Sequence, residues 1–284
     1  MYWDDPEQHV GQERLAQFWL ANDQIREAVN TIITGSPNRW PLEWFCDRFA
    51  ATLPLGHAAV IGCGTGNLER DLLAKQIVEC VTAVDIAGAT VEYARTAAAE
   101  AGVAERIEYV VGDGVALLQQ RPGTFDGIFF HGALHHFASV RHMLRTTREA
   151  LRPNGLLYLD EYVGPSMHQW TWRRLVIPNA VYWFTVPVGF RRPKLVRAPR
   201  NSEDPTEMLD SASIVTEVYR QFRVLDERGY GGNILGLLYP NLRHDIMRSR
   251  PSSAAATVRR LLRIEQWLLL WTPHHHVILI AQRD

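Results

Sequence analysis

A short glycine-rich segment near residue 60 constrains the fold of this chain more than any other feature. The apolar run 58–61 leads directly into Gly62-Cys63-Gly64-Thr65-Gly66, and a helical pattern follows. Glycines let the backbone turn sharply and approach a ligand closely. A strand, a glycine turn and a helix in this order are typical of a parallel α/β sheet that binds a ligand at the turn.

The sequence after residue 55 alternates short apolar runs with stretches of helical periodicity, which indicates β-α-β units. The first five strands are expected to form a doubly wound, mostly parallel sheet, and two more bring it to seven. The last strand is expected to close the sheet edge, and helices are expected at 234–248 and 257–271. The seven predicted strands cover 58–61, 80–85, 107–111, 125–130, 155–161, 222–228 and 275–282.

The remaining segments are expected to surround this Rossmann-like core, which covers 55–162. Residues 1–54 read as an N-terminal helical cap segment, with helices over 7–33 and 41–51. Residues 163–220 are too long for a bare loop, so they predict a helical, aromatic cap inserted after the fifth strand. Residues 221–284 then complete the sheet with inserted helices.

Composition favours a folded intracellular protein. A chain of 284 residues that is 46% hydrophobic can bury a substantial core. The three cysteines form no C-x-x-C pair and match neither a disulfide framework nor a zinc site, which favours a reducing compartment. The first seven residues are acidic and lack a signal-peptide pattern, so we expect a cytoplasmic protein.

Charge is distributed unevenly along the chain. Residues 162–284 carry 17 Lys and Arg against 10 Asp and Glu, and 162–202 contain no acid. Basic residues bracket the apolar run 175–190, which favours an anionic or lipid-like partner and leaves peripheral membrane contact open. The run is too short and too proline-broken for a transmembrane helix. Its aromatic, proline-broken character is more typical of a lid over a ligand site than of a basic surface that binds the phosphates of a nucleic acid.

Five motifs in order resemble the class I S-adenosylmethionine-dependent methyltransferase superfamily, from about residue 55 to about residue 165. Besides the glycine turn, they are a strand ending in Asp85, 19 residues after Gly66, and the segments 111–114, 125–137 and 151–157. Asp85 has the spacing of an acid that holds ribose hydroxyls. The resemblance implies S-adenosylmethionine as cofactor, S-adenosylhomocysteine as product and Asp113 beside the adenine. The implied cofactor-binding residues are Gly62, Cys63, Gly64, Gly66, Asp85, Ile86, Asp113, Gly114, His131 and Gly132.

The chain departs from the family at Val60, where an acid usually contacts the ammonium group of the cofactor. A backbone carbonyl near Gly62 or Gly132, or a carboxylate of the N-terminal segment, is expected to replace it. Glu69 and Asp71 are expected to point away from the pocket on the following helix.

Two histidines follow the fourth strand, whose end faces the sulfonium in the resembled family. His135 and His136 are therefore the candidate catalytic bases, and the alternative is that they cap or pack the next helix. A second candidate set is Asp160, Glu161 and Tyr162. His274 to His276 cannot readily converge from one extended strand, so no metal site is predicted. The aromatic residues Trp170, Trp172, Tyr182, Trp183 and Phe184 form either an acceptor wall or, preferably, the packing of the cap.

These observations predict a methyltransferase that acts on an oxygen or nitrogen of a small-molecule acceptor, which is apolar or anionic in character. An NAD(P)-binding oxidoreductase is disfavoured, because its G-x-G-x-x-G fingerprint needs glycine where this chain has Asn67. A non-catalytic S-adenosylmethionine-binding or scaffold protein is the other alternative. The sequence names neither the acceptor nor the oligomeric state.

Overall fold

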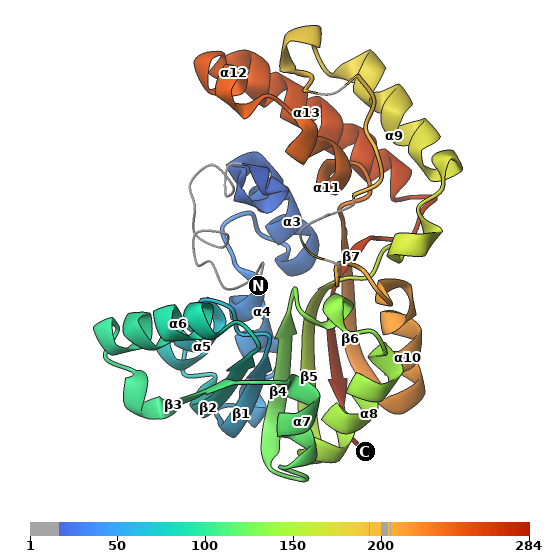
Figure 1. The fold of residues 1–284 in the computed structure, drawn as a ribbon. Helices are drawn as coiled ribbons and strands as arrows, with labels where there is room; N and C mark the ends of the chain where they lie inside the picture. Colours follow the sequence, from blue (N-terminus) through green and yellow to red (C-terminus); the bar gives the residue numbers. More distant parts are fainter. Residues whose placement is uncertain (1–16, 193, 200–203, 205) are drawn as a thin grey trace.

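One mixed sheet organises the computed structural model, which describes residues 17–192, 194–199, 204 and 206–284. Within these ranges its strand order is β3-β2-β1-β4-β5-β7-β6 (Figure 1). Neighbouring strands are parallel except β7, which runs antiparallel to both β5 and β6. The strands are β1 Leu55–Ile61, β2 Val78–Asp85, β3 Ile107–Val111, β4 Phe125–His131, β5 Leu151–Tyr162, β6 Arg223–Gly231 and β7 His276–Gln282.

The central strands are apolar because both of their faces are buried. Along β1, Ala58 and Val60 join one core cluster, whereas Ala59 and Ile61 join the other. Successive side chains of a strand point to opposite faces, so a strand covered on both sides needs a continuous apolar run.

Helices cover both faces of the sheet. On one face α4, α5 and α6 pack over the strands, and on the other lie α7, α8 and α10. The helices are α3 Asp23–Thr34, α4 Pro41–Arg48, α5 Asn67–Ala74, α6 Gly88–Glu100, α7 Gly114–Gln119, α8 Val140–Ala150, α9 Trp172–Thr185, α10 Ile214–Gln221, α11 Leu235–Leu238, α12 His244–Ser249 and α13 Pro251–Leu268.

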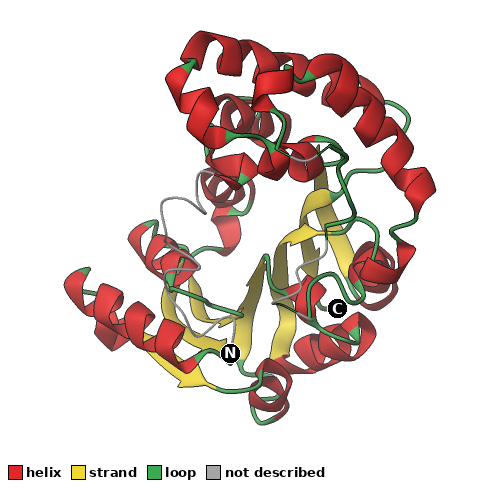
Figure 2. Ribbon diagram, turned by 45° about the horizontal axis from the view of Figure 1, so that its top comes forward, coloured by secondary structure: helices red, strands yellow, loops and turns green. Residues whose placement is uncertain are grey.

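A second helical layer stands beyond the carboxyl ends of the strands (Figures 1 and 2). It contains α3, α9, α11, α12 and α13, and α13 contacts both α3 and α9. The cap therefore combines the N-terminal segment, the insertion after β5 and the helices between β6 and β7. The end of the insertion, α10, instead packs against α8 beside the sheet.

The predicted seven-stranded Rossmann-like fold with a cap is confirmed, but one strand position is wrong. The final strand β7 lies inside the sheet, and β6 forms the edge. The run Val277 to Ala281 is completely buried, whereas most of β6 is partly exposed. An uninterrupted apolar run is typical of an interior strand, so the sequence held this signal.

The N-terminal helix is shorter than predicted. Within the described residues, α3 begins at Asp23, where the Asn22 side chain caps it by accepting a hydrogen bond from the Ile25 amide. Residues 7–16 of the expected helix lie outside the described residues. None of the helices in the described ranges is both long and apolar enough to cross a bilayer.

Candidate cofactor and acceptor site

A cavity of about 980 Å³ opens where the strand order reverses between β1 and β4. This switch point is where open α/β sheets bind their ligands. Of the sequence-predicted candidate residues, Gly66, His135, Glu161 and Tyr162 are not in the lining. The lining brings together Gly62, Cys63, Gly64, Asp85, Ile86, Asp113, Gly114, His131, Gly132 and His136.

The glycine turn is built from backbone conformations that L side chains rarely adopt. Gly62, Gly64 and Gly66 have φ values of 72°, 52° and 73°. The amides of Gly62 and Cys63 both donate to the carbonyl of Val84, which ties the turn to β2. A Cβ at Gly62 would lie 2.5 Å from the Cβ of Ala133, so the segment that follows β4 also approaches the turn closely.

The carboxylate of Asp85 is fixed by two backbone amides. Its Oδ2 accepts from Gly64 at 2.9 Å, and its Oδ1 accepts from Ala87 at 3.0 Å. Each carboxylate oxygen can accept a further hydrogen bond. Asp85 therefore lies in the cavity wall with its orientation set before any ligand binds.

Asp113 caps a helix and also lines the cavity. Its Oδ1 accepts from the Ala116 amide at 2.9 Å and caps α7. Gly114 is tightly packed, because a Cβ there would lie 2.8 Å from the Ile61 side chain. Ile86, which follows Asp85 and also lines the cavity, is 55% exposed and offers an apolar surface to a flat ligand.

The ends of β4 and β5 place His131 and the carboxylate of Asp160 in the cavity lining. The Gly132 amide donates to the carbonyl of Asp160 at 2.8 Å. One carboxylate oxygen of Asp160 accepts from the Tyr230 hydroxyl at 2.6 Å, and the other lies 3.6 Å from His131 Nδ1. Asp160, from the second candidate set, is thus a cavity residue.

The N-terminal segment contributes residues that the sequence did not single out. Arg26 and Trp40 line the cavity, and the Arg26 guanidinium lies 4.9 Å from the centre of the Trp40 ring. Burial lowers the pKa of Arg26, while the charge of Asp160 opposes this effect. Arg26 and Trp40 precede the glycine turn at Gly62 by 36 and 22 residues and belong to none of the motifs, so no local pattern could reveal them.

Both acids of α5, Glu69 and Asp71, were expected to point away from the pocket, and only Glu69 does so. Asp71 lines the cavity, so the expectation that the helix carries it away was wrong. Glu69 is completely buried, and its carboxylate oxygens have no hydrogen-bond partner in the described part of the chain. Burial raises the pKa of Glu69 to about 8.

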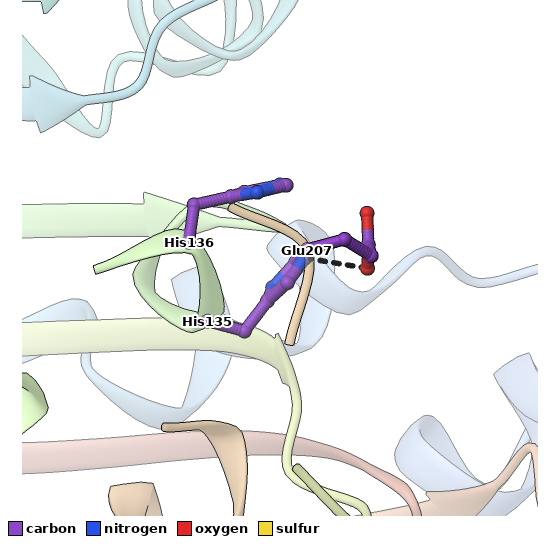
Figure 3. A group of neighbouring side chains, drawn as sticks. All are labelled: His135, His136 and Glu207. Carbon is purple, nitrogen blue, oxygen red and sulfur yellow. Dashed lines mark ion pairs between the residues drawn. The ribbon is translucent and has the colours of Figure 1, made fainter. Parts of the chain in front are cut away.

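His135 is buried outside the cavity lining, between the carboxylates of Glu161 and Glu207. It belongs to a short turn, η5 Leu134–His136. Its Nδ1 lies 2.8 Å from Glu161 Oε2, and its Nε2 lies 3.5 Å from Glu207 Oε1 (Figure 3 shows Glu207). Burial alone would lower the pKa of His135, but the two carboxylates raise it to about 10.

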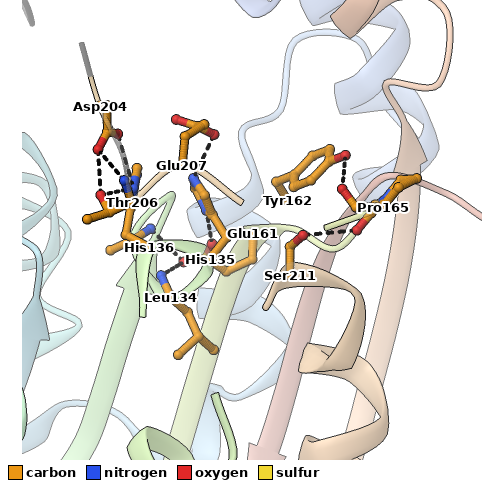
Figure 4. Close-up of polar contacts among 12 residues, drawn as sticks. Leu134, His135, His136, Glu161, Tyr162, Pro165, Asp204, Thr206, Glu207 and Ser211 are labelled. Atoms are coloured by element: carbon orange, nitrogen blue, oxygen red, sulfur yellow. Dashed lines mark hydrogen bonds and ion pairs between the residues drawn. The ribbon is translucent and has the colours of Figure 1, made fainter. Parts of the chain in front are cut away.

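The carboxylate of Glu161 organises the whole turn. Its other oxygen accepts from the amides of Ala133 and Leu134 at 2.7 and 2.8 Å (Figure 4). Although burial would raise the pKa of Glu161, the charged His135 and these amides lower it. Glu161, the second member of the alternative set, thus positions His135.

His136 is the histidine that reaches the cavity. Its Nδ1 lies 3.1 Å from Thr206 Oγ1 and 3.4 Å from Asp204 Oδ2, as Figure 4 shows. Burial and the charge of His135 lower the pKa of His136. The residues Asp204, Thr206 and Glu207 belong to the insertion, and no local motif linked them to the histidines.

The predicted aromatic set lines neither the cavity nor, for the most part, the core. Trp172, Trp183 and Phe184 are 72%, 50% and 88% exposed, whereas Tyr182 is buried. The preferred prediction of cap packing is therefore wrong for Trp172 and Phe184. Trp183 does pack within the cap, because its Nε1 donates to the carbonyl of Lys194 at 3.1 Å and the Arg191 guanidinium lies 4.9 Å from its ring centre. The aromatic rings of the cavity are those of Trp40, Phe137 and Tyr158.

The remaining titratable candidates have structural surroundings. His275 contacts Tyr162 and Trp170, while His276 packs against Trp19. Burial lowers the pKa of His276 to about 3. All three cysteines are free thiols, and burial raises the pKa of Cys63 well above its ordinary value, so this thiol is not activated.

Comparison with known proteins agrees with this geometry. Residues 59–159 match a family described as "Methyltransferase domain". A ubiquinone biosynthesis O-methyltransferase of Xanthomonas campestris is 32% identical over 51% of this chain and 56% of its own length. A 27-O-demethylrifamycin SV methyltransferase of Amycolatopsis mediterranei is 31% identical over 41% of this chain and 43% of its own length.

Among solved structures, a putative sarcosine dimethylglycine methyltransferase from Galdieria sulphuraria shares the fold. Its TM-score is 0.54 at 15% identity, over 85% of this chain and 84% of that one. The chain spans about half the length of the curated relatives it matches. The matched residues include the glycine turn, Asp85 and the strand before His131. Residues 59–159 are therefore similar to a methyltransferase domain, and the relatives and the shared fold support the class I S-adenosylmethionine-dependent methyltransferase superfamily, whose cofactor is S-adenosylmethionine.

Proposed function

We propose that this chain transfers the methyl group of S-adenosylmethionine to an oxygen or nitrogen of a small molecule held between the sheet and the cap. One observation carries the proposal. The glycine turn, Asp85, Asp113 and the end of β4 line a single cavity of about 980 Å³. A cavity of this size is at the upper end of ligand pockets, so it has room for a cofactor and an acceptor together.

The lining suggests a place for each part of the cofactor. In this proposal, the amides of the glycine turn wrap the methionine part, and Asp85 accepts from the ribose hydroxyls. Asp113 and Gly114 border the adenine, and Ile86 covers its face. His131 and Gly132 lie nearest the sulfonium.

The missing acid at Val60 needs a substitute, and the structure offers a pair of opposite charges. Asp160 is the proposed partner of the ammonium group, because it lines the cavity and its orientation is held by Tyr230. Arg26 is the proposed partner of the cofactor carboxylate. Burial of both side chains strengthens their interaction with a charged ligand.

The proposed reaction is an in-line displacement. The bond from the sulfonium to the methyl carbon breaks as the bond from the acceptor oxygen or nitrogen to that carbon forms, and the acceptor loses a proton. Positioning and water exclusion supply most of such catalysis, because the donor is already activated. His136 is the candidate to accept the proton, since it lines the cavity whereas His135 does not.

Oxygen is the favoured acceptor atom, and we propose an acceptor of apolar or anionic character. The names of two relatives specify O-methylation or a 27-O-demethylated substrate. In the cap, α9 and the residues that follow α13 expose large apolar side chains, among them Trp172, Phe184 and Trp271, and the Arg173 guanidinium lies over the Trp172 ring. We propose that this surface contacts an anionic lipid surface, in a chain that works in the reducing cytoplasm.

The proposal is tested by following S-adenosylhomocysteine formation with a panel of phenols, hydroxy acids and amines. His136→Ala should reduce turnover at least about 10-fold while S-adenosylmethionine affinity is retained, since general bases contribute roughly 100-fold or more. His142→Ala, on α8 away from the cavity, is the matched control. Binding of the cofactor without turnover on any acceptor would favour the non-catalytic alternative, and preference for NAD(P) would favour the oxidoreductase.

A further inference from the structure

Three side chains beside the cavity present metal-ligand atoms to one another. They are His135 and His136 of the turn after β4 and Glu207 of the cap insertion (Figure 3). One ligand atom from each lies within 4.8 Å of the other two. Two imidazoles and one carboxylate, with a fourth position open, are a common ligand set of catalytic zinc sites.

The spacing is close to what a metal requires. His135 Nε2 lies 3.5 Å from Glu207 Oε1. Ligand atoms at about 2.0–2.1 Å from a tetrahedral zinc ion lie about 3.3 Å apart. The three atoms lie within 4.8 Å of one another, so the widest pair would have to close by up to roughly 1.5 Å to bind one ion.

His135 is held in the orientation of a metal ligand. Glu161 occupies its Nδ1 at 2.8 Å, so Nε2 is the nitrogen that points at Glu207. Metal-bound histidines almost always donate their other ring N–H to a carboxylate or carbonyl, which fixes the ring. Glu161 is itself fixed by the amides of Ala133 and Leu134 (Figure 4).

The backbone around Glu207 is also fixed to the turn. The Leu209 amide donates to the carbonyl of His135 at 3.1 Å, and the Met167 amide donates to that of Met208 at 2.9 Å. Asp210 accepts from the Val140 amide at 3.1 Å. The insertion is thus anchored beside the histidines by contacts that do not involve the ligand side chains.

The cluster is rich in carboxylates. Glu161, Asp204 and Glu207 lie against the two imidazoles. Asp204 is 2% exposed, and its Oδ2 has no hydrogen-bond partner among the described residues. A buried carboxylate oxygen of this kind is costly unless a cation is near.

We propose that His135, His136 and Glu207 bind one divalent transition-metal ion, with zinc the best match, and that Glu161 orients the site. Because His136, Asp204 and Thr206 line the cavity, the open position of the ion borders it. This inference rests on the proposed methyl transfer only for the role of the ion, which is to bind the acceptor oxygen. With the ion bound, His136 would be a ligand and would no longer serve as the base considered above. The metal-bound hydroxyl would have a lowered pKa, and its proton would pass to water as the methyl group arrives.

The test uses the full chain after treatment with EDTA and dialysis. Calorimetric titration with Zn²⁺, Co²⁺ and Mn²⁺ should show one high-affinity site per chain, and bound Co²⁺ should give visible ligand-field bands. Glu207→Gln and His136→Ala should each weaken binding at least about 10-fold. Glu161→Gln should weaken it by about 10- to 100-fold, as is typical of residues that orient a ligand.

Matched variants control for adventitious binding. His142→Ala and Asp245→Asn remove a partly exposed histidine and an exposed carboxylate away from the cluster, and they should leave the affinity unchanged. Equal affinity in Glu207→Gln, His136→Ala and the parent chain, or no binding by folded protein, would overturn the inference. S-adenosylmethionine binding is measured in the same metal-free samples. Binding of S-adenosylmethionine by a chain that binds no metal would leave the proposed function intact. Binding of metal by a chain that does not bind S-adenosylmethionine would contradict the proposed function alone.

Discussion

The Oδ2 atom of Asp85 accepts a hydrogen bond from the amide of Gly64 at 2.9 Å. This contact joins the acid that ends β2 to the glycine turn that ends β1. The two parts of the proposed cofactor site are therefore positioned by each other, even without a ligand.

Asp85→Asn tests the proposed ribose contact. Asparagine keeps the shape but loses the charge, and hydrogen bonds to charged groups contribute about 1.5–3 kcal/mol. We expect S-adenosylmethionine affinity to fall by about 10- to 100-fold, as measured by calorimetry. Asp245→Asn, on the surface of α12, should change nothing. Unaltered affinity in the Asp85 variant would remove this residue from the site.

Gly62→Ala tests the need for close approach at the turn. Alanine at this position combines a positive φ with a Cβ 2.5 Å from that of Ala133. Gly102→Ala is the matched control, because its φ is also positive (70°) but nothing lies within 4 Å of an added Cβ. We expect the Gly62 variant to lose several kcal/mol of unfolding free energy and its cofactor binding, against about 1 kcal/mol for the control. Denaturant unfolding gives both values, and equal losses would show that close packing is not the constraint.

Glu69→Gln tests the buried acid behind the turn. Burial raises the pKa of Glu69 to about 8 from its ordinary value of 4.5. The folded chain therefore binds a proton more tightly than the unfolded chain, so unfolding free energy should fall as pH rises from about 4.5 to about 8. Glutamine does not titrate, and this part of the pH dependence should disappear.

The measurement for Glu69 is denaturant unfolding of both chains at pH 5.5 and 8.5. Relative to the parent chain, the glutamine variant should gain several kcal/mol between the two pH values, because one pKa unit corresponds to about 1.4 kcal/mol. Parallel pH dependence of the two chains would show that Glu69 is ionised in the folded protein at neutral pH.

The apolar surface of α9 gives a prediction about membranes. Trp172 and Phe184 are 72% and 88% exposed, and the guanidinium of Arg173 lies over the Trp172 ring. The chain should sediment with vesicles that contain phosphatidylserine, and less so at high salt. Replacing both residues by serine should weaken binding at least about 10-fold, because each large apolar side chain contributes roughly 1.5–3 kcal/mol on burial.

Tyr93→Ser, at an exposed tyrosine of α6, is the control for the membrane experiment. It should bind vesicles like the parent chain. If the parent chain does not bind anionic vesicles and instead forms a dimer through α9, as measured by sedimentation velocity, the surface is a protein interface.

The features that the sequence revealed are those encoded locally. The alternation of strands and helices, the glycine turn and the acid at position 85 are all read within short windows of sequence. Even the misplaced edge strand had a local signal in the unbroken apolar run of β7.

Contacts between distant segments could not be predicted in this way. The pair of Tyr230 with Asp160, the approach of Glu207 to His135 and the placement of Arg26 in the cavity depend on how the cap folds over the sheet. The exposure of Trp172 is also a tertiary property, since apolar composition does not say which face of a helix is covered.

Calorimetric titration of the purified chain with S-adenosylmethionine is the decisive experiment for cofactor binding. We expect one site per chain, weakened by Asp85→Asn and lost in Gly62→Ala, with no comparable binding of NAD⁺ or NADP⁺. Folded protein that released no heat with S-adenosylmethionine, or that bound it equally well in both variants, would contradict the assignment of this crevice.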